Sequence, residues 1–420
     1  MSARRRPRPV TVPARRPASA PVLAALVAVL AVLSACSGPP PAGPPPSPAA
    51  APAPFAAPAE PVLTPVVADV PYPPVPVLGE DERTHLVYEL ELTNFTPGPV
   101  TVEQVEALGP AGEVLGTLGA ADVASRLKPS GGAAYAPNLA GGQHGMLFVH
   151  VALPPGTPAP PSLTHRLVAR VGGQAVTEES VAPTTVDARR LPVLAPPLAG
   201  EGYLAADGCC DAVRHTRAAL PVNGSPVLAQ RYAIDYERVG PDGRIYAGPK
   251  EDLRSYRIYG NEVFAVAEGT VVTALDGQPE QVPGTYPEDI PITLADGNYV
   301  LLDVGNDFFV TFAHLQTGSV RVRPGDRVRA GDVLGLVGNT GNSVAPHLHL
   351  HVTDGPSSIA SQGLPYLVDE FTLTGRVAST ASFDRAEADG VPVELTPGIA
   401  PTPFRDRMVL DQAIVTYRRP

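Results

Sequence analysis

Residues 335–353 read GLVGNTGNSVAPHLHLHVT, a glycine- and asparagine-rich stretch that ends in alternating histidine and leucine. Alternation at a period of two predicts a β-strand, so His347, His349 and His351 should share one face while the leucines point to the other. Residues two apart on a strand lie about 6.5 Å from each other, so one imidazole can bind a metal ion while its neighbour addresses a water molecule. The stretch therefore predicts a metal site, and the simpler alternative is a polar strand face or adventitious metal binding by a histidine-rich tract.

Composition bounds the fold class and excludes one class of partner. The chain has 420 residues, enough for roughly two or three domains, and its 52 prolines and 40 glycines favour short strands and loops over a helical bundle. The formal net charge is −11, although residues 1–35 hold six arginines and no acidic residue. The remainder carries 25 of the 31 basic residues against 42 acidic ones, so we expect no nucleic-acid partner.

The first 62 residues have the pattern of an export and anchoring segment. An arginine-rich start precedes an apolar run from Pro21 to Leu33, which is too short to span a bilayer and fits the hydrophobic part of a signal peptide. The sequence Leu-Ser-Ala-Cys that ends at Cys36 resembles the lipobox of bacterial lipoproteins, which implies a signal peptide over residues 1–35 and lipidation of Cys36. The alternative is a free cysteine beside an ordinary cleavage site.

The next segment, residues 36–62, is dominated by proline and alanine. Such a linker is either a semi-rigid polyproline stalk of roughly 70 Å or a disordered spacer. Together with the lipobox it predicts an extracytoplasmic protein of the cell envelope, held to a membrane by a lipid anchor. The sequence leaves open whether that membrane is the outer or the cytoplasmic one.

Residues 63–190 contain short alternating segments separated by proline- and glycine-rich turns, a pattern typical of an immunoglobulin-like sandwich. The expected strands are Thr84–Asn94, Val100–Leu108, Met146–Leu153 and Leu163–Val171. The histidines of this module lack the spacing of metal ligands, and we interpret them as surface or core residues; they are His85, His144, His150 and His165. The module therefore reads as a spacer or binding domain without visible chemistry.

An Asn-Gly pair at residues 223–224 predicts a β-hairpin near the start of a second module. Pairing across this turn sets Val222 opposite Ser225. If the pairing continues, His215 lies opposite Tyr232 and reaches the strand that follows.

We assign no chemical role to two further features of the sequence. Cys209 and Cys210 are adjacent, and they could form a vicinal disulfide, pair between molecules or stay reduced. Residues 371–420 contain strand-like stretches and form a C-terminal β extension that completes the preceding domain or covers one of its edges.

Four features within residues 205–355 together resemble the lysostaphin-type peptidoglycan metallopeptidases. They are Asp235, the Phe-Ala-His-Leu segment that contains His314, the two Gly-Asp turns of residues 324–332, and the Pro-His-Leu-His run of His347 and His349. The resemblance implies a barrel-sandwich-hybrid fold, a duplicated hybrid motif, with one Zn²⁺ in a groove. It also implies that Asp235 and His349 are zinc ligands, while His314 and His347 are catalytic residues that handle the attacking water.

One position departs from the family pattern. The family places a third zinc ligand, a histidine, four residues before the aspartate, and this chain has Arg231 there, whose guanidinium stays protonated and cannot bind a metal. Two outcomes remain open: His215 restores the third ligand, or Arg231 pairs with Asp235 and replaces the metal. His351 also falls outside the family pattern and receives no role.

The resemblance implies a zinc metalloendopeptidase that cleaves peptide cross-links of peptidoglycan with zinc-activated water. We expect a mostly β chain, with the sandwich over residues 63–190 followed by a metallopeptidase-like domain over residues 203–370. The alternative is a catalytically inert homologue that binds or activates a cell-wall amidase or another divisome component. The expected partners are peptidoglycan and, through the lipid anchor, a membrane.

Overall fold

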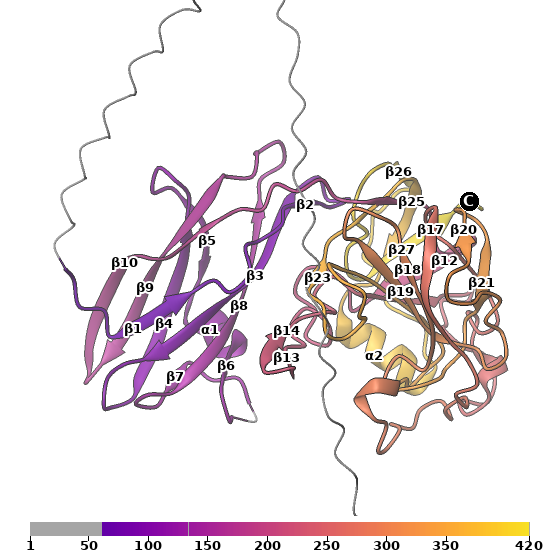
Figure 1. The fold of residues 1–420 in the computed structure, drawn as a ribbon, viewed down its shortest axis with the longest axis horizontal. Helices are drawn as coiled ribbons and strands as arrows, with labels where there is room; N and C mark the ends of the chain where they lie inside the picture. The colour runs from indigo at the N-terminus through magenta and orange to yellow at the C-terminus, as the bar shows by residue number, and fades with distance from the viewer. Residues whose placement is uncertain (1–60, 133, 420) are drawn as a thin grey trace, which may run out of the picture. The chain divides into compact units, whose positions relative to one another are not determined.

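The computed structural model describes residues 61–132 and 134–419, and residues 62–420 form one compact unit (Figure 1). The expected signal peptide, Cys36 and nearly all of the linker lie outside the described residues, so they remain predictions. Within the described part of the chain, no helix is both long and apolar enough to cross a membrane.

The first module is a β-sandwich, as its alternating segments predict. Its elements are β1 (Val66–Asp69), β2 (Val77–Leu78), β3 (Thr84–Asn94), β4 (Val100–Leu108), β5 (Val114–Leu118), α1 (Ala120–Arg126), β6 (Leu127–Pro129), β7 (Asn138–Leu139), β8 (His144–Leu153), β9 (Ser162–Val171) and β10 (Gln174–Thr185). One sheet has the order β1-β3-β8-β6 with β2 beside β3, and the other has the order β10-β9-β4-β5 with β7 beside β4. Apolar side chains of both sheets share one core.

The second module is built on one large sheet of eleven strands. Its strands are β12 (Gly200–Ala206), β15 (Ile234–Arg238), β17 (Gly269–Leu275), β18 (Asn298–Asp303), β19 (Phe309–Leu315), β20 (Arg327–Val328), β22 (Leu348–Thr353), β23 (Gly363–Leu364), β25 (Phe371–Arg376), β26 (Thr402–Phe404) and β27 (Ala413–Tyr417). They are hydrogen-bonded in the order β20-β17-β18-β19-β22-β15-β12-β27-β25-β26, with β23 beside β22. The path is open, so these strands do not close a barrel, and the predicted mostly β fold class is confirmed.

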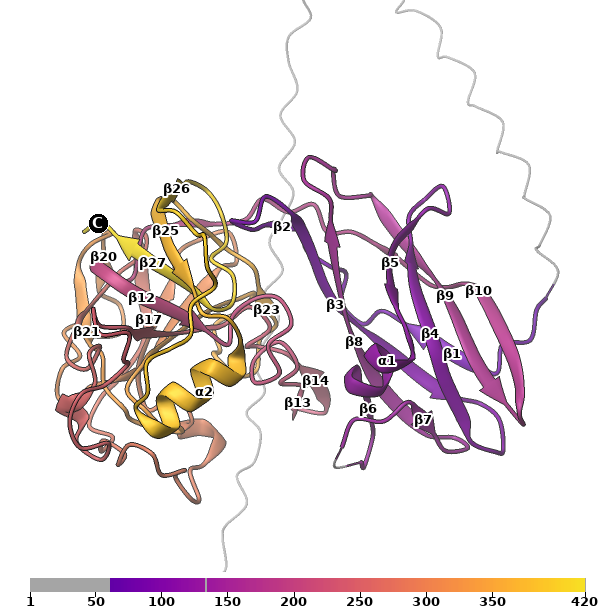
Figure 2. The same ribbon diagram turned by 180° about the vertical axis from the view of Figure 1, so that it is seen from behind.

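Three small ladders and three short helices complete this module. The ladders pair β11 (Val193–Leu194) with β24 (Leu367–Val368), β13 (Leu220–Val222) with β14 (Ser225–Val227), and β16 (Glu262–Phe264) with β21 (Val333–Leu336). The helices are η1 (Leu253–Ser255), η2 (Ile292–Leu294) and α2 (Thr380–Asp389), the last of which lies between β25 and β26 in the chain (Figure 2). Ser379 caps the start of α2 and Gly390 ends it in a left-handed conformation.

The middle of the large sheet brings three site segments side by side. Asp235 of β15 pairs with His349 of β22, and on the other side His349 pairs with Ala313 of β19. Because neighbouring strands in a sheet lie about 4.8 Å apart, this register places residues that are far apart in sequence next to one another.

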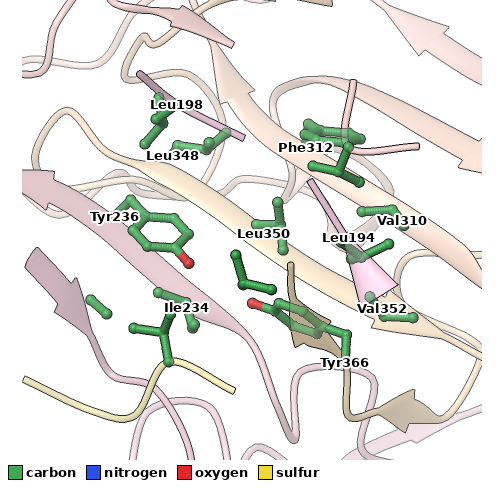
Figure 3. Close-up of a cluster of buried hydrophobic side chains, with 14 of the residues drawn as sticks. Leu194, Leu198, Ile234, Tyr236, Val310, Phe312, Leu348, Leu350, Val352 and Tyr366 are labelled. Carbon is green, nitrogen blue, oxygen red and sulfur yellow. The ribbon is translucent and has the colours of Figure 1, made fainter. Parts of the chain in front are cut away.

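Alternation along these strands divides their side chains between two faces. Ile234, Tyr236, Leu348 and Leu350 point into the apolar core, where they pack with Phe312 of β19 (Figure 3). The residues between them therefore face the opposite way. This arrangement confirms the strand predicted from the His-Leu alternation, with one adjustment: β22 starts at residue 348, so the first histidine of the run precedes it.

The C-terminal residues belong to the same sheet. Strand β27 pairs with β12 on one side and with β25 on the other, and β26 forms the edge. The predicted β extension over residues 371–420 thus continues the sheet that carries the site. The same extension also contains α2.

Candidate metal centre

Five side chains predicted from the sequence line one groove of about 680 Å³. Asp235 comes from β15, His349 from β22 and His314 from the end of β19, while His347 lies one residue before β22. His215 comes from the turns between β12 and β13. All except Asp235 and His347 are less than a tenth exposed.

The polar atoms of these residues converge on the Asp235 carboxylate. Its Oδ1 lies 2.7 Å from His349 Nδ1 and 3.4 Å from His347 Nε2, and its Oδ2 lies 3.4 Å from His215 Nε2. Candidate ligand atoms of His215, Asp235 and His349 lie within 4.8 Å of one another, and those of His314, His347 and His349 do so as well. Groups this close can share a single ion, because Zn–N and Zn–O bonds are about 2.0–2.2 Å long.

Backbone carbonyl groups fix the tautomers of three of the imidazoles. The Nδ1 atoms of His215, His314 and His347 lie 2.9, 2.7 and 2.7 Å from the carbonyl oxygens of Asp207, Thr340 and Ala345. A carbonyl oxygen only accepts, so each Nδ1 carries the hydrogen and donates it. A ring with its single hydrogen on Nδ1 presents its Nε2 lone pair to the groove, which is the form that binds a metal or accepts a proton.

The pKa shifts agree with this assignment. Burial raises the pKa of Asp235, but the surrounding imidazoles, that of His215 first, outweigh burial and hold its pKa well below the usual range. Burial lowers the pKa of His349 and lowers the pKa of His314 well below its usual value. Metal ligands must be deprotonated, so an ionised Asp235 beside His349, whose pKa burial lowers, is a donor set that fits a divalent zinc ion.

His314 depends on an irregularity in β19. Between the pairs Asn298↔Leu315 and Val300↔Phe312 the register shifts, so β19 has one more residue than β18 at this point. His314 itself has φ 61°, in the left-handed region that non-glycine residues rarely adopt. Bulges re-aim side chains, and this one turns His314 into the groove beside His347, with 4.6 Å between the ring centroids.

The residue that departs from the family pattern does not enter the groove. Arg231 is buried, and its Nε and Nη2 donate to the two carboxylate oxygens of Glu89 on β3, at 3.0 and 2.7 Å. Its Nη1 donates to the carbonyl of Gly363. The predicted alternative, in which Arg231 pairs with Asp235, is therefore wrong: Glu89 of the first module satisfies the guanidinium instead.

His215 reaches the site by a route other than the one predicted. The hairpin pairs Val222 with Ser225 as expected, but the ladder ends at Leu220. Hydrogen-bonded turns precede it, so His215 does not lie opposite Tyr232, and that register was wrong. The bond from His215 Nδ1 to the Asp207 carbonyl, not strand pairing, holds the imidazole beside Asp235.

Acidic residues that the sequence reasoning did not single out also line the groove. They are Asp207, Glu237, Asp296, Asp384 and Glu387. Glu237 lies two residues after Asp235 on the same strand face, a spacing that could have indicated it. Its Oε2 has no hydrogen-bond partner among the described residues, and burial and the nearby Glu387 carboxyl raise its pKa well above the usual value. Glu387 comes from α2, and nothing local in the sequence indicates this.

A second group of potential ligands occurs elsewhere in the described residues. His85, His150 and Cys210 lie close together, but the Cys210 sulfur is bonded to that of Cys209. A sulfur in a disulfide is not the thiolate that binds a metal. Of the three states considered for this cysteine pair, the structure shows the vicinal disulfide.

Residues 255–360 match the family described as Peptidase family M23. Endolysin 2638A of Staphylococcus phage 2638A is 34% identical over 105 residues, covering 24% of this chain and 18% of the endolysin. Peptidoglycan DD-endopeptidase ShyA of Vibrio cholerae is 42% identical over 53 residues, covering 13% of this chain and 12% of that protein. The chain thus spans less than a fifth of the length of either relative.

Among solved structures, a mutant of the catalytic domain of the prophage-encoded M23 protein EnpA from Enterococcus faecalis is similar. It is 18% identical, covers 40% of this chain and 92% of the EnpA chain, and has a TM-score of 0.24. The family match contains His314, His347 and His349, whereas His215 and Asp235 precede it.

Proposed function

We propose that the protein, whose residues 255–360 match peptidase family M23, is a zinc metalloendopeptidase that hydrolyses peptide bonds in peptidoglycan. Relatives of this domain include an endolysin and a peptidoglycan DD-endopeptidase, which supports the substrate class. The observation that carries the proposal is that candidate ligand atoms form two compact groups in the groove that share His349, one with His215 and Asp235 and the other with His314 and His347.

Asp235, His349 and His215 are the residues that would hold the zinc ion. Their candidate ligand atoms form one compact group, the pKa of Asp235 is held well below its usual range, and burial lowers the pKa of His349, as metal binding requires. When bound, zinc lowers the pKa of a water molecule and polarises the scissile carbonyl.

His314 and His347 act on the proton and on the developing charge. Both rings donate from Nδ1 to a backbone carbonyl, so Nε2 of each is free to accept a proton from the attacking water. Burial keeps the pKa of His314 low, which makes this ring a neutral acceptor at the start of the reaction. His347 Nε2 lies 3.4 Å from Asp235 Oδ1 and lines the same groove, so this ring is placed to pass a proton on to the oxyanion or to the leaving amine.

The inert alternative has less support than the hydrolase. It depended on Arg231 displacing the metal, and the guanidinium is instead fully engaged by Glu89 and Gly363. No other described observation favours a binding or activating role for this groove over hydrolysis.

The proposal includes attachment to a membrane at the cell envelope. It rests on the sequence alone, namely the apolar run, the lipobox-like segment and Cys36. Metabolic labelling with a radioactive fatty acid tests it: the wild-type chain should incorporate label and Cys36→Ala should not.

Metal analysis and a gel assay for clearing of peptidoglycan test the enzymatic proposal together. We expect one zinc per chain and a clearing zone that His347→Ala abolishes while retaining zinc. A wild-type chain without zinc and without clearing would reject the hydrolase and favour the inert homologue.

A further inference from the structure

His351 is a buried histidine beside the site to which neither the family pattern nor the mechanism assigns a role. It is 0% exposed and lies on β22 two residues after His349, so both side chains share one strand face. Its Nδ1 lies 2.9 Å from His349 Nε2, and its own Nε2 lies 2.9 Å from the carbonyl oxygen of Ser358. Both ring nitrogens are therefore engaged by specific partners.

The Ser358 carbonyl decides where the hydrogens of this pair reside. A carbonyl oxygen only accepts, so His351 carries its hydrogen on Nε2 and donates it. A histidine ring that carries its single hydrogen on Nε2 has a lone pair on Nδ1. Nδ1 of His351 then has a lone pair, and it accepts the Nε2 hydrogen of His349.

The consequence for His349 is an exposed lone pair on Nδ1. That nitrogen lies 2.7 Å from Asp235 Oδ1, which is also a hydrogen-bond acceptor. Two acceptors at this distance repel each other unless they share a cation or a proton. The arrangement is therefore suited to a metal ion bound by both atoms.

The turn that supplies the terminal acceptor is itself held in place. Ser358 Oγ donates to Asp296 Oδ2, and the carbonyl of Asp296 accepts from the backbone N–H of His314. The relay from Ser358 to His349 is thus tied to the loop that orients the catalytic histidine.

We propose that His351 is a positioning residue that fixes the tautomer of His349 and so presents the Nδ1 lone pair to the zinc ion. His215, His314 and His347 each reach a backbone carbonyl directly, whereas His349 reaches one only through His351. The proposal rests on the proposed function insofar as the ion is zinc.

Zinc affinity of two matched variants tests the relay in the full chain. His351→Leu removes the acceptor, whereas His351→Asn keeps an acceptor oxygen at nearly the same place, and the two side chains have similar shapes. Outer-shell partners of metal-binding histidines contribute about 10–100-fold to affinity, so we expect a loss of that size in His351→Leu and recovery of most of it in His351→Asn. Competition with a chromogenic chelator measures both, and wild-type affinity in His351→Leu would overturn the proposal.

A tautomer measurement on the unmodified chain is independent of any variant. In metal-free protein labelled with ¹⁵N-histidine, long-range ¹H–¹⁵N spectra should show a hydrogen on His349 Nε2, with or without a second proton shared between Nδ1 and Asp235. A hydrogen on Nδ1 alone would refute the relay. If the wild-type chain takes up no zinc, the proposed function fails, while this spectrum still decides the role of His351.

Discussion

Buried histidines in the two β-modules have different surroundings, although both modules are built from alternating strands. In the sandwich, His165 has both nitrogens engaged: Nε2 lies 2.9 Å from the Tyr88 hydroxyl and Nδ1 lies 3.2 Å from the Ala182 carbonyl. In the groove, the hydrogen bond of His314 is made by Nδ1 to a backbone carbonyl, and the ring shares a compact group of candidate ligand atoms with His347 and His349.

The charged pair near the groove follows the pattern of the sandwich. Both carboxylate oxygens of Glu89 accept from Arg231, and the remaining Nη1 of Arg231 donates to the Gly363 carbonyl. The comparison teaches that burial does not distinguish a structural histidine from a site histidine. What distinguishes them is whether the second nitrogen finds a neutral partner or converges with other acceptors on one point.

Breaking the fully satisfied pair should give the largest effect. Glu89→Gln leaves the Arg231 guanidinium buried without a counter-charge, and removal of one partner of a buried ion pair costs about 3–5 kcal/mol. Chemical denaturation should show this loss in the free energy of unfolding, with zinc content unchanged. The double variant Glu89→Leu with Arg231→Met should recover most of it, and a single-variant cost below about 1 kcal/mol would contradict this reading.

Removing a converging histidine should affect turnover and not folding. We expect His314→Ala to lower kcat about 10²–10⁴-fold, the usual contribution of a general acid or base, while zinc stays bound. The measurement is turnover of a soluble cross-linked muropeptide, with His144→Ala of the sandwich as the control. Equal kcat in wild type and His314→Ala would remove His314 from the catalytic residues.

His165, in the core of the sandwich, should affect how the free energy of unfolding depends on pH. Burial lowers the pKa of His165 to about 4, whereas an unfolded histidine titrates near 6.5. As the pH falls from 6.5 to about 4, the unfolded chain binds a proton that the folded chain does not, so stability is lost, by about 3 kcal/mol. His165→Gln should flatten the denaturation midpoint against pH in this window; an unchanged slope would show that His165 is not responsible.

The smallest expected change concerns the third ligand. His215→Ala removes one of three candidate zinc donors, and we expect the zinc dissociation constant to rise at least about 10–100-fold, the range seen even for outer-shell partners. Metal analysis after dialysis against a chelator measures it. Arg231→His is the matched variant: its side chain starts from a position directed at Glu89, so it should not tighten zinc binding. Unchanged zinc content in His215→Ala would exclude His215 as a ligand.

Local sequence patterns were sufficient for part of this site. The His-Leu alternation predicted the strand that carries His349, and the Asn-Gly pair predicted the turn between β13 and β14. The first signal is an alternation of apolar and polar residues and the second is a two-residue turn, and each depends on backbone geometry over only a few residues. The resemblance added Asp235 and His314, whose proximity comes from the register of the large sheet.

The remaining features depend on contacts between residues that are distant in sequence. The direction of Arg231 is set by Glu89, which precedes it by 142 residues. Glu387 lines the groove from α2, which belongs to the C-terminal extension. His215 reaches the groove from a hydrogen-bonded turn and not from the predicted ladder. The periodicity of the sequence does not predict these long-range contacts, because each depends on which distant residue best satisfies a buried polar group.

The four carbonyl anchors of the imidazoles, those of Asp207, Thr340, Ala345 and Ser358, have a consequence for protein design. The main chain imposes the protonation pattern, and the side chains at the anchor positions contribute by holding these segments in place, as Ser358 does through Asp296. Transplanting the groove histidines and His351 onto another scaffold would accordingly fail unless the three supporting segments moved with them, because Thr340 and Ala345 both lie between β21 and β22.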